Sequence, residues 1–199
     1  ILKDLKINTF FNKKINLDKK FKDKFDFIIV ATYENNNFHL RKKKKKKFQL
    51  VEKIIVKTPN FLKKKSFVIM DGNFMCIDPY INSKYSIIGN VKKTIHFENI
   101  DYFPKIEEKY QKLIKKYYNE KQAFSKFSLI NDDYKYFFNT NENLKFYSSF
   151  FVTRCTVPNK EKTDERLTSI DKHGKVISLF AGKWVSSFEG AKKLLKIFK

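Results

Sequence analysis

The chain has few of the residues that usually mark export, metal binding or a disulfide framework. Its 199 residues include two cysteines, Cys76 and Cys155, which lie far apart and outside any Cys-x-x-Cys spacing. We therefore expect two free, buried thiols in a reducing compartment. No apolar run approaches the roughly 20 residues that cross a bilayer, and the first residues, "ILKDLKINTFF", lack the organisation of a signal peptide. These absences predict a cytoplasmic protein without a membrane span.

Histidine is scarce as well. His39, His96 and His173 have no metal-ligand spacing, so we expect them on the surface or in loops, and we expect no metal site. The carboxylates of Asp71 and of Asp132-Asp133 fit turns. No residue stands out as an indispensable general base.

Acidic residues and arginine are the remaining deficits. Lys and Arg number 43 against 21 Asp and Glu, for a net charge of +22, and only Arg41, Arg154 and Arg166 are arginine. Nucleic-acid recognition favours the planar guanidinium fork, whereas abundant Lys, Asn, Ile and Phe is what an AT-rich coding sequence produces in any protein. We expect no dedicated nucleic-acid partner. A lysine-rich RNA-binding or ribosome-associated protein stays the alternative, with a continuous basic face and salt-steep binding.

Apolar and aromatic residues are plentiful enough for one substantial core. Apolar runs and turn residues predict strands at 25–32, 48–57, 66–80 (two, around Asp71-Gly72), 85–97 (two, around Gly89-Asn90), 144–157 and 175–182. Residues 41–47, "RKKKKKK", are expected to form a solvated loop or strand end, or alternatively a polyanion-binding tip. The pattern predicts an α+β fold with a largely antiparallel sheet.

Two helices are expected. One opens at Pro104 and covers the sheet with Ile106, Tyr110, Leu113, Ile114 and Tyr117. The last begins near Ser186, where Ser186 and Glu189 have the spacing of a capping box, and its apolar stripe comprises Phe188, Ala191, Leu194, Leu195 and Phe198.

The junction before the last helix, Gly182-Lys183-Trp184, is the most suggestive local feature. A strand, a glycine turn and a helix N-terminus present free backbone N–H groups and the positive end of a dipole. An anion or an electron-rich carbonyl would suit such a site. The alternative is an ordinary strand-to-helix connection with Lys183 in water.

Three segments together resemble a known family. "FDFIIVATY" (25–33), "FFVTRCTVPNKEKTDERLTSI" (150–170) and "GKVISLFAGKWVSSFEGAKKLLKIF" (174–198) are similar to parts of FAD-dependent oxidoreductases of the D-amino-acid oxidase and glycerol-3-phosphate dehydrogenase type. The resemblance covers nearly the whole chain but not the family's Gly-x-Gly-x-x-Gly fingerprint, which lies upstream of the Ala-Thr strand. It therefore implies the carboxyl-terminal part of a longer flavoprotein, and Tyr33 departs from the glycine common at its position.

The resemblance also implies roles for particular residues. FAD would be bound by Ala31, Thr32, Tyr33, Gly182, Lys183, Trp184 and Val185. A small amine or hydroxy substrate with an anionic group would be held by Arg154, Arg166 and Tyr80, and would pass a hydride to the flavin. Its implied domains are 1–36 and 151–199 for part of the Rossmann-like FAD domain and 37–150 for an antiparallel substrate domain. A catalytically silent flavoprotein-like scaffold is a third possibility.

The scarcity of arginine indicates Arg154 and Arg166 as anion-binding residues independently of the family. Arg154 and Arg166 lie in one short segment of a chain whose cations are almost all lysine. A bidentate carboxylate or phosphate contact needs the guanidinium fork. The alternatives are structural, with Arg166 paired to a neighbouring carboxylate or fixing its loop to the sheet.

Overall fold

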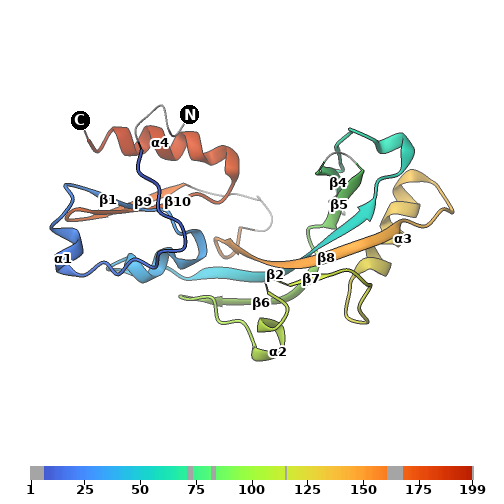
Figure 1. Ribbon diagram of the computed structural model, residues 1–199, viewed down its shortest axis with the longest axis horizontal. Coiled ribbons are helices and arrows are strands. Elements are labelled where there is room, and N and C mark those ends of the chain that lie inside the picture. Colours follow the sequence, from blue (N-terminus) through green and yellow to red (C-terminus); the bar gives the residue numbers. More distant parts are fainter. Residues whose placement is uncertain (1–6, 71–73, 82–83, 115, 161–167, 199) are drawn as a thin grey trace.

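The computed structural model describes residues 7–70, 74–81, 84–114, 116–160 and 168–198. Two sheets make up the α+β architecture, one of three strands and one of seven (Figure 1). The small sheet and the last helix form one lobe, while the far half of the large sheet and its covering helix form the other. The two longest strands, β2 (Lys46–Lys57) and β8 (Lys145–Thr156), extend from one lobe to the other.

The three-stranded sheet joins the two ends of the chain. Its order is β1 (Ile28–Val30), β10 (Val176–Phe180) and β9 (Ser169–His173). β1 runs parallel to β10, and β9 runs antiparallel to it through a hairpin at Gly174, whose φ of +56° suits glycine. Strand β9 was not expected, because its sequence, "SIDKH", lies in a polar, turn-rich stretch. The strand is held by backbone hydrogen bonds to β10, which do not require an apolar side-chain pattern.

The seven-stranded sheet has β2 at its centre. Besides β2 and β8 it contains β3 (Phe67–Val68), β4 (Met75–Tyr80), β5 (Tyr85–Asn90), β6 (Ile95–Asp101) and β7 (Tyr117–Tyr118). The strand order is β3-β4-β5-β2-β8-β7. On the side of β2 opposite β8, β5 pairs with the second half of β2 and β6 with the first half. The two strands expected in 85–97 are present, but the chain turns at 91–94 and not at Gly89-Asn90. The expected Asp71-Gly72 turn lies outside the described residues.

Strand β2 is buried on both faces, whereas the period-two spacing of Phe48, Leu50, Ile54 and Val56 in the sequence predicts a strand with one buried face. Phe48, Leu50, Ile54 and Val56 are buried as expected, and Val51 and Ile55 on the opposite face are buried too. A central strand covered on both faces has no solvent side, so its apolar run is nearly continuous. The prediction that residues 41–47 form a solvated loop or strand end is wrong for Lys46, whose exposed fraction is only 6%.

The helix that covers the sheet is not the one expected. α3 (Phe127–Phe138) packs Ile130 and Tyr134 into a core cluster with residues of β2, β4 and β5. The stretch after Pro104 forms only one turn, α2 (Glu108–Gln111), before Tyr117 and Tyr118 add to the edge of β8 as β7. Backbone pairing with β8 thus overrides the helical spacing of the apolar side chains.

The last helix is present, but of its expected apolar stripe only Leu194 is buried. α4 (Ser187–Leu195) follows the short 3₁₀ turn η3 (Trp184–Ser186) and packs against the small sheet through Gly190 and Leu194. Phe188 is 76% exposed, and Leu195 and Phe198 are exposed as well. Gly190 has no side chain, which lets the helix come close to Leu179. Phe188 and Leu195 lie on the side of the helix away from the sheet.

Short helical turns complete the chain. They are α1 (Lys19–Lys22), η1 (Tyr33–His39) and η2 (Asn60–Leu62). No helix among the described residues is long and apolar enough to cross a membrane. Strand β8 runs through the expected boundary at residue 150 to Thr156, and the division into domains stays a prediction.

Candidate functional site

The carboxyl ends of β1 and β10 lie side by side. Because the two strands are parallel and Val30 pairs with Ser178, the residues that follow each strand emerge at the same edge of the small sheet. Ala31 and Thr32 follow β1 and are exposed, and Gly182 follows β10. The structure therefore brings together the two segments that the sequence nominated separately.

A buried asparagine holds this edge together. Asn36 accepts a hydrogen bond from the Thr32 N–H at 2.9 Å and donates one to the Leu179 carbonyl at 2.7 Å. It thereby ties η1 to the ends of both strands. The run Asn35-Asn36-Asn37 predicted only a turn, because nothing in its spacing shows that two of the three amides are buried.

Tyr33 connects the small sheet to the large one. Its φ of +52° is in the left-handed region, which costs a residue other than glycine of order 1 kcal/mol. Its ring is stacked on Phe180 with the centroids 5.7 Å apart. Its hydroxyl meets the backbone of Cys155. The Tyr33 side chain is therefore directed to the sheet junction, and only its backbone lies beside Ala31 and Thr32.

The N-terminus of α4 lies at the same edge. The helix begins beside the Gly182 turn and runs back over the small sheet (Figure 1). The expected capping box is wrong: Ser186 has helical backbone angles and no side-chain capping bond, and Glu189 pairs with Lys193 at 2.6 Å. Trp184 is 91% exposed, and Val185 beside it is also exposed. Two of the nominated cofactor residues thus form an open apolar surface.

Arg154 projects from β8 onto the opposite face of the sheet from Cys155. Its Nε donates to Gln49 Oε1 at 2.7 Å and its Nη2 to the Val91 carbonyl at 3.2 Å. Gln49 in turn donates to Glu98 at 2.8 Å. These contacts fix the plane of the guanidinium.

Of the other two nominated substrate residues, the structure describes only Tyr80, which lies on β4 and not beside Arg154. Tyr80 ends β4, where its hydroxyl is hydrogen-bonded with that of Tyr117, and this bond raises the Tyr80 pKa. Arg166 lies outside the described residues. Their roles stay predictions.

A buried ionic cluster was missed. Glu52 on β2 accepts hydrogen bonds from Ser125 Oγ at 2.7 Å and the Lys126 N–H at 2.8 Å, and its Oε2 lies 2.9 Å from His96 Nε2. Burial raises the Glu52 pKa, but the bonds from His96, Lys126 and Ser125 outweigh it and hold the pKa below its ordinary value. His96 is therefore not a surface histidine. The signal was a carboxylate inside the apolar run "LVEKIIV".

Two other expectations about charged residues are wrong. Asp133 lies in α3, buried, and accepts hydrogen bonds from Asn90 and Lys93. Lys46 places its ammonium 3.6 Å from the centroid of the Phe180 ring, and burial lowers its pKa. Both cysteines are free: Cys155 is buried as expected, while Cys76 is only partly so.

No protein-family model, curated protein or solved structure matches the chain. Within the described ranges, no group of three or more His, Cys, Asp or Glu side chains could hold a metal ion.

Proposed function

We propose that the chain is part of an FAD-dependent oxidoreductase that takes a hydride from a small amine or hydroxy substrate carrying an anionic group. The observation that carries the proposal is the parallel pairing of β1 with β10, which brings the residues after both strands, Ala31-Thr32 and Gly182, to the same end of the small sheet. Ligands of open α/β sheets bind at the carboxyl ends of the parallel strands. The helix N-terminus at this edge adds a favourable dipole.

The residues at this edge fit a flavin ring. The left-handed φ at Tyr33, where the resembling family commonly has glycine, supports a backbone shaped for close approach to a cofactor. The exposed Ala31 and Thr32 and the open apolar surface of Trp184 and Val185 suit a flat aromatic ligand. FAD would supply the hydride acceptor. The backbone of 182–186 and the α4 dipole would favour the negative charge of the reduced ring.

The protein's own residues have separate roles in this proposal. Arg154, oriented by Gln49 and the Val91 carbonyl, would bind the anionic group of the substrate and fix its position. Lys183 would add positive charge at the helix N-terminus. A deprotonated, aligned substrate would need no further base.

The small sheet supports the idea that the site is completed by other residues. Among the described strands β1 pairs only with β10, and its Ile29 is exposed, as are Phe188 and Leu195 on α4. Parallel sheets normally bury both faces. A strand and helix added here would bring the dinucleotide-binding turn that the chain's sequence does not contain.

The test uses the chain together with the sequence encoded immediately upstream. We expect the purified protein to show a flavin absorption spectrum that is bleached anaerobically by an amino or hydroxy acid. Arg154→Lys should raise the substrate KM at least tenfold with a smaller effect on kcat. Arg41→Lys, at an exposed position, is the matched control. A protein that binds no flavin even with added FAD would overturn the proposal.

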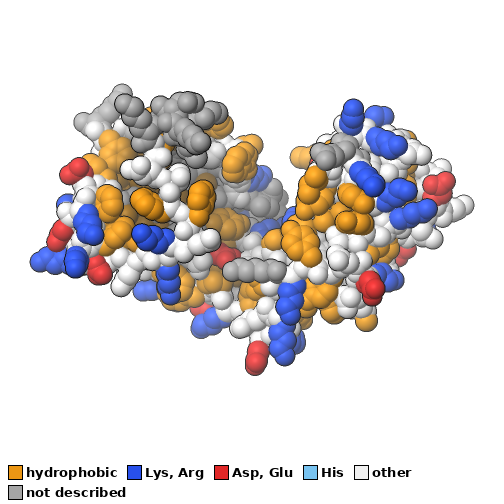
Figure 2. All heavy atoms as spheres, in the orientation of Figure 1, with side chains coloured by type: hydrophobic (Ala, Val, Ile, Leu, Met, Phe, Trp, Pro, Cys, Tyr) orange, Lys and Arg blue, Asp and Glu red, His pale blue; other side chains and the backbone are white. Residues whose placement is uncertain are grey.

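The same preparation tests the RNA-binding alternative. On the face shown in Figure 2, Lys and Arg side chains are spread over both lobes among apolar and acidic groups, with no single basic stripe. That distribution favours the enzyme. Tight, salt-steep RNA binding without a flavin spectrum would reverse the order of the two proposals.

A further inference from the structure

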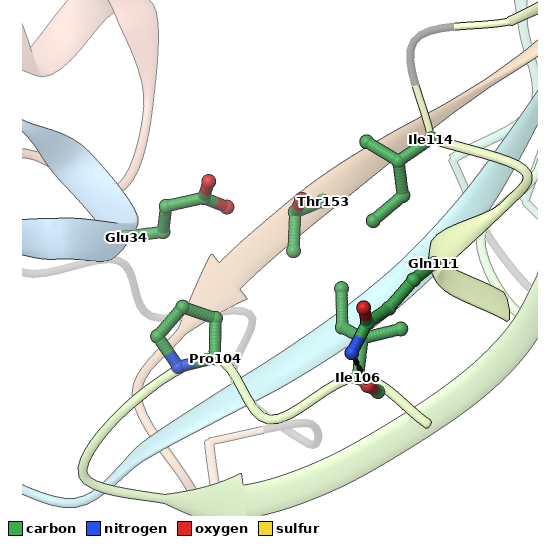
Figure 3. A pocket seen from close by; sticks show the side chains of 6 residues that line it. All are labelled: Glu34, Pro104, Ile106, Gln111, Ile114 and Thr153. Atoms are coloured by element: carbon green, nitrogen blue, oxygen red, sulfur yellow. Dashed lines mark hydrogen bonds between the residues drawn. The ribbon is translucent and has the colours of Figure 1, made fainter. Parts of the chain in front are cut away.

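A hollow with a cavity volume of about 390 Å³ lies between η1, β8 and the segment after Pro104 (Figure 3). It is lined by Glu34, Pro104, Ile106, Gln111, Ile114 and Thr153. Its size is within the roughly 300–1,000 Å³ that is usual for small-molecule sites. Thr153 and Arg154 are consecutive on β8, so they project to opposite faces of the sheet. The hollow is therefore a different place from the proposed substrate contact.

The polar groups of the hollow have a common chemistry. Glu34 presents a carboxylate, and Figure 3 shows it directed across the hollow toward Thr153. Gln111 donates from its amide N–H₂ to the Ile106 carbonyl at 2.9 Å, which fixes the amide, and its Oε1 is a hydrogen-bond acceptor. Thr153 adds a hydroxyl. Among the described lining residues none is cationic, and no described side chain pairs with Glu34.

The remaining lining is aliphatic. Pro104, Ile106 and Ile114 form a wall beside the acceptor groups. Ile114 is held there by its bridge to Phe151 on β8. A ligand that satisfies both halves carries several N–H donors and a positive charge at one end, and an apolar body at the other. A carboxylate or phosphate would instead be repelled by Glu34.

We propose that this hollow binds a small primary ammonium compound with an apolar body. The ammonium group pairs with Glu34 and donates to Thr153 Oγ and Gln111 Oε1, while the body packs on Pro104, Ile106 and Ile114. The inference does not depend on a flavin. Because the net charge of +22 repels cations at long range, the local contacts act best at about 0.15 M salt, where the Debye length is about 8 Å.

The experiment titrates the 199-residue chain with 2-phenylethylammonium at 0.15 M salt and follows ¹³C-labelled isoleucine methyl groups by NMR. We expect the methyl resonances of Ile106 and Ile114 to shift. Those of the fully buried Ile88 and Ile130, in the core cluster under α3, should not change. The neutral 2-phenylethanol and the anionic 3-phenylpropionate should bind at least tenfold more weakly.

Glu34→Gln should weaken ammonium binding at least tenfold, and the exposed Glu108→Gln, which removes the same charge, should not. Unchanged Ile88 and Ile130 methyl positions verify that each variant is folded. Equal affinity for the ammonium and the alcohol, unaltered binding by Glu34→Gln, or no shift of Ile106 and Ile114 at 20 mM ligand would each overturn the proposal.

Discussion

Tyr33 and Cys155 exchange two hydrogen bonds: the Tyr33 hydroxyl donates to the Cys155 carbonyl at 2.8 Å and accepts from the Cys155 N–H at 2.9 Å. One side chain thereby links the end of β1 to β8. The backbone groups of Cys155 lie in a buried part of the sheet, so the phenol replaces water as their partner.

Removing that hydroxyl should destabilise the protein. Tyr33→Phe leaves the stacking on Phe180 but orphans a buried N–H and carbonyl, and we expect a loss of about 1–3 kcal/mol in the free energy of unfolding. Urea denaturation measures it. Tyr136→Phe, at a residue 79% exposed, should change the free energy by less than about 0.5 kcal/mol. Equal effects would contradict a bridging role for Tyr33.

The cover helix α3 offers a matched pair of truncations. Ile130 is fully buried and its neighbour Leu129 is 45% exposed. Ile130→Ala should cost about 2–5 kcal/mol because it leaves a cavity against the sheet. Leu129→Ala should cost well under 1 kcal/mol, since alanine and leucine have similar helix propensities. If thermal unfolding shows similar losses for both, α3 does not pack as described.

The buried Glu52 should make stability depend on acid pH. Its folded-state pKa lies below the unfolded value of about 4.3. Its contribution is therefore fully present above that value and is lost as the pH falls through the folded-state pKa. Glu52→Gln should lower the free energy of unfolding by about 3 kcal/mol at pH 7, because it leaves His96 without its carboxylate.

The pH series distinguishes this from a simple packing defect. The difference between wild type and Glu52→Gln should shrink as the pH is lowered from 6 to 3, while Glu108→Gln should track wild type throughout. A difference that stays constant with pH would mean that the Glu52 charge contributes nothing.

Cys155 should report on opening of the sheet. Burial raises its pKa to about 11, against a smaller opposing effect of Lys46. About one thiol in a thousand is then ionised at pH 8, and only the thiolate reacts with iodoacetamide. We expect Cys155 to be alkylated at the rate of unfolding, with the rate rising in Tyr33→Phe. Alkylation of native protein as fast as an unstructured cysteine peptide would contradict the buried position.

The long strands were predictable because their sequences are long apolar runs that favour a buried strand. β2, β8 and β10 lie within the predicted ranges or differ by two residues at most. The helix expected after Pro104 was wrong because its spacing carried no information about the unpaired edge of β8 nearby. α3 was overlooked because Asn131, Asp132 and Asp133 resemble a turn, although Asp133 is satisfied by Asn90 across the sheet.

The candidate site was predictable only in its pieces. The strand ends at Ala31-Thr32 and Gly182 could be nominated from local pattern, but their adjacency depends on pairing between distant strands. The hollow around Glu34 could not be found, since its lining comes from three separate segments with no shared motif. Contacts of this kind depend on tertiary packing, which no window of sequence contains.

The pairing of Ile28 with Val176 has a consequence for biosynthesis. At about 5–20 residues per second, a ribosome needs roughly 7–30 s to make the intervening stretch of about 150 residues. Throughout that time the apolar segment around Ile28 lacks its β10 partner, and its β10-facing edge is exposed to chaperones and to other nascent chains. The pairing of β1 with β10 can therefore form only after all strands of the large sheet have been synthesised, and slow codons or chaperone loss should affect this lobe first.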